Sequence, residues 1–132
     1  MNACRLRIVT ETDGERSEFS AEGNSEISGN TLSVFYMQEE DETSLRVQDD
    51  ALFMMRHGVA SSMSAEFRRD SDTTLCILFG ENEARIPVRT VTFQKLQKRE
   101  SIFIALDYEL HFPENSQFFS LKIFIQSISE EK

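Results

Sequence analysis

The residue types best suited to binding a metal are Asp107, Glu109 and His111, which stand at alternate positions of one segment. Alternate residues of a β-strand project from the same face, so these side chains are expected on one surface. Carboxylate and imidazole groups are common ligands of transition metals. However, a strand rises about 3.3 Å per residue, which places Asp107 and His111 roughly 13 Å apart at the backbone. We therefore interpret them as the solvated face of a strand and predict no metal site.

Nucleophilic catalysis is a second chemistry that the residue types allow. A nucleophile needs an adjacent base and a group that orients this base. By residue type alone, Ser61, His57 and Asp107 could form such a set of nucleophile, base and orienting group. No serine lies in a Gly-x-Ser-x-Gly elbow, neither cysteine stands beside a histidine, and no nucleotide-binding or calcium-binding motif is present. The sequence therefore supports no catalytic residue and no cofactor.

The segment Leu52–His57 is apolar on both of its alternating faces until Arg56. Such a segment is either buried against a second layer or part of a wall that faces a ligand. Arg56 then forms an internal ion pair or a rim charge, or it anchors the anionic head group of a ligand. Met54 and Met63 are either adaptable core residues or an adaptable pocket lining. The binding hypothesis combines Arg56, Met54 and Met63 with Tyr108.

These candidates must be positioned by β-strands, because alternation of apolar and polar residues recurs along the whole chain. The clearest examples are these: Leu32, Val34 and Tyr36; Met63, Ala65 and Phe67; Ile102, Ile104, Leu106, Tyr108 and Leu110; Phe119, Leu121, Ile123 and Ile125. Turn residues such as Asp13-Gly14, Gly29-Asn30 and Gly80-Glu81 separate the segments. About ten strands at this spacing, without an amphipathic helix, predict one all-β domain over residues 1–132. The expected architecture is a closed antiparallel up-and-down barrel of 8–10 strands.

Three positions interrupt the alternating pattern. Pro87 cannot donate to a strand ladder, so we expect it at a strand start, a bulge or an edge. Gly23 is expected to mark a bend in a long strand. The polar and basic segment 94–100 is predicted to form a longer loop.

Composition limits the classes of partner. The chain has 132 residues and a formal net charge of −9, which disfavours binding to nucleic acid and to anionic membranes. No apolar run reaches the length of a signal peptide or a membrane span. Cys4 and Cys76 match no spacing motif, so we expect reduced thiols and a cytoplasmic protein.

The order of several short motifs resembles that of the YwiB-like proteins, a family of small bacterial proteins. The motifs are Arg5 to Thr10, Met55-Arg56-His57-Gly58, Met63 to Phe67, Phe79-Gly80 and Ala105 to Leu110. The chain departs from the family at Ile77-Leu78-Phe79, where members tend to carry Thr or Pro just before the glycine. The resemblance implies a calycin-like, lipocalin-related barrel in the bacterial cytoplasm, and such barrels often hold small apolar ligands. It carries over no catalytic residue.

Two classes of function follow. In the first, the barrel binds a small amphipathic or anionic ligand, with Arg56 and Tyr108 near its polar end. In the second, the interior is filled and the protein is an interaction or structural module, either a monomer or a homodimer. Aromatic residues expected on the outer face motivate the second class. These residues are Phe35, Phe53, Phe103, Phe118 and Phe124.

Overall fold

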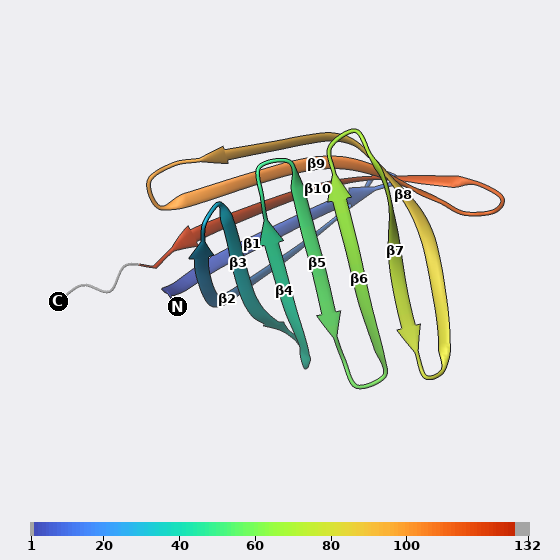
Figure 1. The fold of residues 1–132 in the computed structure, drawn as a ribbon, viewed down its shortest axis with the longest axis horizontal. Coiled ribbons are helices and arrows are strands. Elements are labelled where there is room, and N and C mark those ends of the chain that lie inside the picture. Colours follow the sequence, from blue (N-terminus) through green and yellow to red (C-terminus); the bar gives the residue numbers. More distant parts are fainter. Residues whose placement is uncertain (1, 129–132) are drawn as a thin grey trace.

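A computed structural model describes residues 2–128 and contains ten β-strands (Figure 1). Their bounds are β1 Asn2–Thr12, β2 Glu15–Ser28, β3 Thr31–Gln38, β4 Asp41–Val47, β5 Ala51–His57, β6 Ser61–Arg68, β7 Asp72–Phe79, β8 Asn82–Gln97, β9 Ser101–His111 and β10 Ser116–Ser127. Every strand pairs antiparallel with its neighbours in sequence, and β1 pairs with β10 to close the ring. The predicted closed antiparallel barrel is confirmed, with ten strands.

Short turns set the strand register. Asp13 and Gly14 both have positive φ, at 54° and 77°, which is the geometry of a type I′ hairpin turn. Glu39 has φ 58° in the two-residue turn between β3 and β4, so this turn also uses the left-handed region. Turns of this kind match the twist of the strands they join, which favours a chain that runs up and down around the ring.

The alternating apolar residues face inward and form the core. Fully buried side chains include Leu6, Val34, Leu45, Leu52 and Ile104, which come from five different strands. Burial on β9 alternates strictly between buried and half-buried residues from Ser101 to His111. The period-two pattern of the sequence therefore assigns the inner face of the barrel correctly.

The ring is not fully paired at either end: residues 92–97 of β8 pair with β9 alone at one end, and gaps on β2 and β8 lie at the other. Residues 15–22 of β2 pair with β1 alone, and pairing with β3 begins only at Gly23. Residues 82–87 of β8 pair with β7 alone, and pairing with β9 begins at Val88. The walls diverge where these ladders stop, because a strand that lacks a neighbour on one side leaves the ring open there.

The edge position of Pro87 agrees with the sequence prediction, and Gly23, where a bend was predicted, is the residue at which β2 gains β3 as a second partner. A Cβ atom at Gly23 would collide with the carbonyl oxygen of Phe35, so only glycine fits where β2 changes partners. Pro87 lies one residue before the ladder between β8 and β9 begins. Its missing N–H therefore leaves no gap in that ladder.

The loop predicted for 94–100 is wrong over most of its length. Residues 94–97 continue β8 and pair with β9, ending at Gln97 opposite Ile102. Lys95 points inward, and its ammonium lies 3.1 Å from Asp49, so a side chain that looks solvated is only 14% exposed. A partner remote in sequence pairs with this half-buried lysine, and the local sequence gives no sign of that partner.

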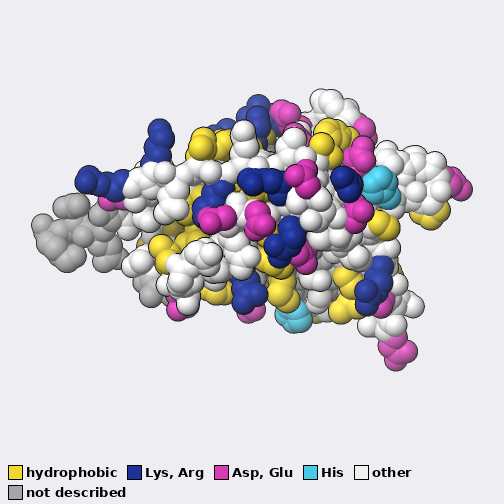
Figure 2. Space-filling view, turned by 45° about the horizontal axis from the view of Figure 1, so that its top comes forward, with side chains coloured by type: hydrophobic (Ala, Val, Ile, Leu, Met, Phe, Trp, Pro, Cys, Tyr) yellow, Lys and Arg dark blue, Asp and Glu magenta, His cyan; other side chains and the backbone are white. Residues whose placement is uncertain are grey.

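The outer surface is mixed in charge. Figure 2 shows Lys and Arg side chains interspersed with Asp and Glu over the visible face, with apolar side chains between them. Two arginines of β8 are paired with acids on this surface: Arg85 with Glu83, and Arg89 with Asp72. No element within residues 2–128 is a helix long and apolar enough to cross a membrane.

Candidate functional site

The barrel interior contains a cavity of about 360 Å³ at the end where residues 15–22 of β2 pair with β1 alone. The lining comes from β1, β2, β3, β5, β6, β7, β9 and β10, so residues from most of the ring meet there. Its residues are Ile8, Thr10, Ser17, Glu18, Phe19, Tyr36, Gln38, Met54, Met63, Ala65, Phe67, Leu75, Tyr108 and Leu121. Most of them are apolar or aromatic.

Three of the predicted site residues line this cavity: Met54, Met63 and Tyr108. Met54 on β5 stands opposite Ala65 on β6, which in turn stands opposite Leu75 on β7, so one cross-strand row forms a wall. Tyr108 comes from β9, outside this group of consecutive strands. Closure of the ring brings these residues together although they lie far apart in sequence.

Aromatic rings cluster around Tyr108. Its ring stacks on Phe119 at 5.1 Å with an interplanar angle of 7°, and the ring of Phe67 lies 4.6 Å away at a tilt of 49°. A second pair, Phe19 and Tyr36, has ring centroids 5.8 Å apart. The binding hypothesis omitted Phe19, Tyr36 and Phe67, although Tyr36 and Phe67 occupy inward positions of the alternating pattern.

Both tyrosines of the chain have largely buried side chains. Burial raises the pKa of Tyr108 to about 12. Burial also raises the pKa of Tyr36 to about 12, against a smaller opposing effect of the nearby Arg56 charge. Neither hydroxyl has a hydrogen-bond partner within residues 2–128. The cavity therefore contains two neutral phenols that can donate a hydrogen bond.

Arg56 lies at the rim rather than in the cavity lining. It continues the inward face of β5 beyond Met54 and stands between Thr43 on β4 and Met63 on β6. Its Nε donates to Oδ2 of Asp41 at 2.7 Å, and about a third of each of the two side chains is exposed. Of the alternatives for Arg56, this geometry matches an ion pair at the barrel mouth.

A Cβ atom on Gly58 would lie 2.5 Å from Oδ1 of Asp41. The glycine that follows His57 therefore leaves room for the carboxylate of this ion pair. The Arg56–Asp41 pair joins residues 15 positions apart across the hairpin of β4 and β5. Asp41 was not predicted as the partner of Arg56, because residues 39–42 are all acidic and offer several carboxylates.

The other constellations do not assemble into sites. Asp107 accepts hydrogen bonds from Thr92 at 2.8 Å and from Ser120 at 2.6 Å, and His57 contacts Ser62 at 3.2 Å. The catalytic arrangement of Ser61, His57 and Asp107 that the residue types allowed therefore does not form. Among residues 2–128 no three His, Cys, Asp or Glu side chains converge as metal ligands.

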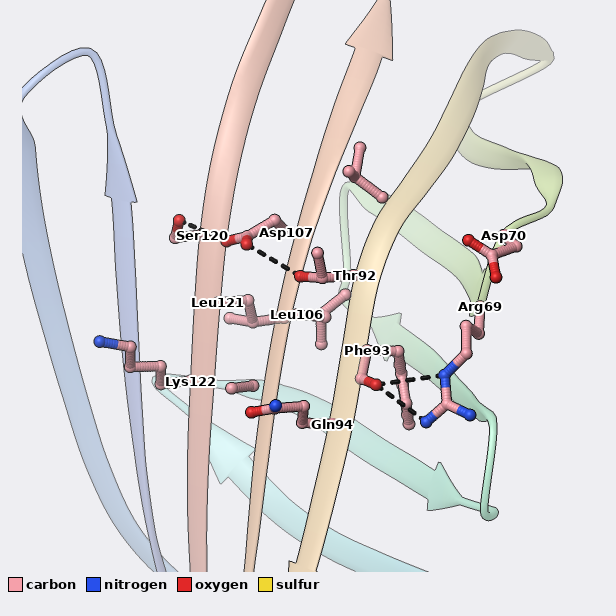
Figure 3. Close-up of a pocket in the computed structure, with 12 residues that line it drawn as sticks. Arg69, Asp70, Thr92, Phe93, Gln94, Leu106, Asp107, Ser120, Leu121 and Lys122 are labelled. Atoms are coloured by element: carbon pink, nitrogen blue, oxygen red, sulfur yellow. Dashed lines mark hydrogen bonds between the residues drawn. The ribbon is translucent and has the colours of Figure 1, made fainter.

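Asp107 lies in an open outer groove of about 540 Å³ (Figure 3). The guanidinium of Arg69 makes two hydrogen bonds to the carbonyl oxygen of Phe93, at 3.2 and 2.8 Å. These bonds lie next to the bulge of β8 at Thr90–Thr92, where β8 has left its partner β7. Arg69 and Asp107 are thus each bonded to neighbouring groups of the protein, so we interpret these two side chains as structural.

The aromatic residues predicted on the outer face do lie there. Phe35, Phe118 and Phe124 are exposed by 40%, 46% and 37%. Phe103 packs on Phe124 at 4.8 Å, and arginine side chains cover Phe124 and Phe53. The outer aromatics are thus divided among several strands and partly covered.

Comparison with known proteins supports the fold. A family model described as a domain of unknown function, DUF1934, matches residues 4–123. The crystal structure of the ywiB protein from Bacillus subtilis superimposes with a TM-score of 0.82 at 21% identity, over 97% of this chain and 93% of that one. The predicted resemblance to YwiB-like proteins is confirmed at the level of fold. No curated protein sequence matches the chain.

Proposed function

The chain belongs to the DUF1934 family, described as a domain of unknown function, and we propose from the cavity itself that the barrel binds a small amphipathic molecule. The observation that carries this proposal is the interior space of about 360 Å³. Ligand sites usually occupy roughly 300–1,000 Å³ and combine apolar walls with a few polar groups. The cavity meets both criteria.

The composition of the walls supports binding rather than simple packing. Met54 and Met63 are flexible side chains that adapt to different ligand shapes. The ring of Tyr108 gives a flat apolar surface with a polar end. A packed core would place its largest side chains in this space, whereas Ala65 stands in the middle of the wall.

Fluorescence of N-phenyl-1-naphthylamine, an uncharged apolar probe, tests this proposal. We expect saturable enhancement of probe fluorescence by the full chain, with one site per barrel. Native mass spectrometry of freshly purified protein should also show a small molecule that leaves under mild activation. Absence of saturable probe binding would overturn the proposal.

The alternative of an interaction module depends on the outer aromatics. Their partial cover by Arg7 and Arg68 reduces the exposed apolar area. Light scattering during size exclusion tests self-association, and a concentration-dependent dimer would favour this alternative.

A further inference from the structure

We propose that the cavity selects an uncharged ligand, which has an apolar body and one hydrogen-bond acceptor, over a carboxylate of the same size. This inference rests on the proposed binding function and deepens it by naming the ligand class. It replaces the anionic form of the sequence hypothesis, in which Arg56 anchors a negative head group.

The cavity lining offers no cation to a bound anion. Glu18 is the one charged residue in the lining within the described part of the chain. Its carboxylate is held by Arg7 at 3.2 Å and by Arg16 at 2.9 Å, which keeps the pKa of Glu18 below its usual value. A ligand carboxylate inside the cavity would lose its hydration without gaining a counter-ion, which is costly.

The cation of the inward face of β5, Arg56, is also already neutralised. Arg56 donates to Asp41 at 2.7 Å, so an incoming carboxylate would have to compete with a carboxylate of the protein. Breaking that pair would leave Asp41 without its partner. The formal net charge of −9 further lowers the local concentration of anions.

The other polar residues of the lining are uncharged: Thr10, Ser17, Gln38 and the two tyrosines. Tyr36 and Tyr108 line the cavity, are only 6% and 8% exposed, and have hydroxyls without a partner within residues 2–128. Each of these hydroxyls therefore keeps a donor that an acceptor on the ligand can use. A carbonyl, ether or alcohol oxygen satisfies the requirement without bringing a charge.

Matched ligands test the proposal. We expect 1-octanol to displace N-phenyl-1-naphthylamine from the full chain at a concentration about ten-fold lower than octanoate does at neutral pH. Equal or stronger displacement by octanoate would overturn the inference and leave the proposed function intact. Failure of the probe to bind at all would overturn both.

Two matched substitutions separate the role of the mouth ion pair from a general change in charge. Asp41→Asn removes the partner of Arg56, so we expect displacement by octanoate to improve about ten-fold, with displacement by octanol unchanged. Asp49→Asn makes the same chemical change in the Lys95 pair, outside the cavity lining, and should alter neither. An Asp41→Asn protein that rejects octanoate as strongly as the native chain would contradict the role assigned to the pair.

The hydroxyl groups are tested by Tyr108→Phe, which keeps the ring that stacks on Phe119. We expect octanol affinity to fall several-fold more than affinity for N-phenyl-1-naphthylamine in this variant, and further when Tyr36→Phe is added. Unchanged octanol affinity in the double variant would show that the phenols do not recognise the ligand.

Discussion

Replacing Ala65 by leucine tests whether the interior space is available. Ala65 lies in the cavity wall between Met54 and Leu75 and is 6% exposed. The leucine side chain would enter the cavity of about 360 Å³ rather than a packed region. Ala51→Leu is the matched control, because Ala51 is fully buried, lies outside the cavity lining and receives the same added atoms.

The two variants should change stability in opposite directions. Leucine adds three carbon atoms, and each buried carbon contributes about 0.8 kcal/mol, so Ala65→Leu could stabilise the fold by up to about 2 kcal/mol. Ala51→Leu should lower the free energy of unfolding by about 1–3 kcal/mol, because the residues packed around Ala51 must move to admit the same atoms. The sign of the change in the free energy of unfolding is therefore the informative quantity.

Urea unfolding followed by circular dichroism measures both variants, with an unchanged m-value as the criterion for an unchanged unfolding transition. Ala65→Leu should also weaken the binding of N-phenyl-1-naphthylamine, whereas Ala51→Leu should not affect binding by the folded fraction. If Ala65→Leu destabilises the fold as much as Ala51→Leu, the interior is packed in solution. The reasoning from the cavity would then be refuted.

Arg69→Ala should destabilise the fold by about 1–3 kcal/mol in urea unfolding, because the Phe93 carbonyl loses both of its guanidinium donors; an unchanged midpoint would contradict a structural role for the groove. Gly23→Ala should lower the free energy of unfolding by about 1–3 kcal/mol, because the added Cβ collides with a backbone carbonyl. An unchanged free energy of unfolding would show that the strands can move apart. Burial raises the pKa of Tyr36 and of Tyr108 to about 12, above the value of about 10 expected in the unfolded chain. Their contribution to stability is therefore complete below about pH 10 and is lost as the pH rises toward 12. Phenolate absorbance measures the ionisation of these side chains directly, since the chain has two tyrosines and no tryptophan. Titration of the tyrosines near pH 10 in the folded protein would contradict their burial.

Local alternation was sufficient to predict the strands and their inner faces. Met54, Met63 and Tyr108 were selected from their positions in the pattern, and all three line the cavity. Segment 94–100 was mispredicted as a loop because its residues, Lys95 among them, are polar or charged. Lys95 can point inward only because its ammonium pairs with Asp49, which lies far away in sequence.

The sequence by itself determined the all-β class and the side of the sheet on which each strand residue lies, because neighbouring residues in a strand point to opposite faces whatever the partner strand is. Only the tertiary structure decided that Arg56 pairs with Asp41 and where β2 and β8 pair with one neighbour instead of two. Both depend on how strands are staggered around the ring. A two-residue period is the same for every stagger that keeps the inner faces aligned, so it cannot specify either feature.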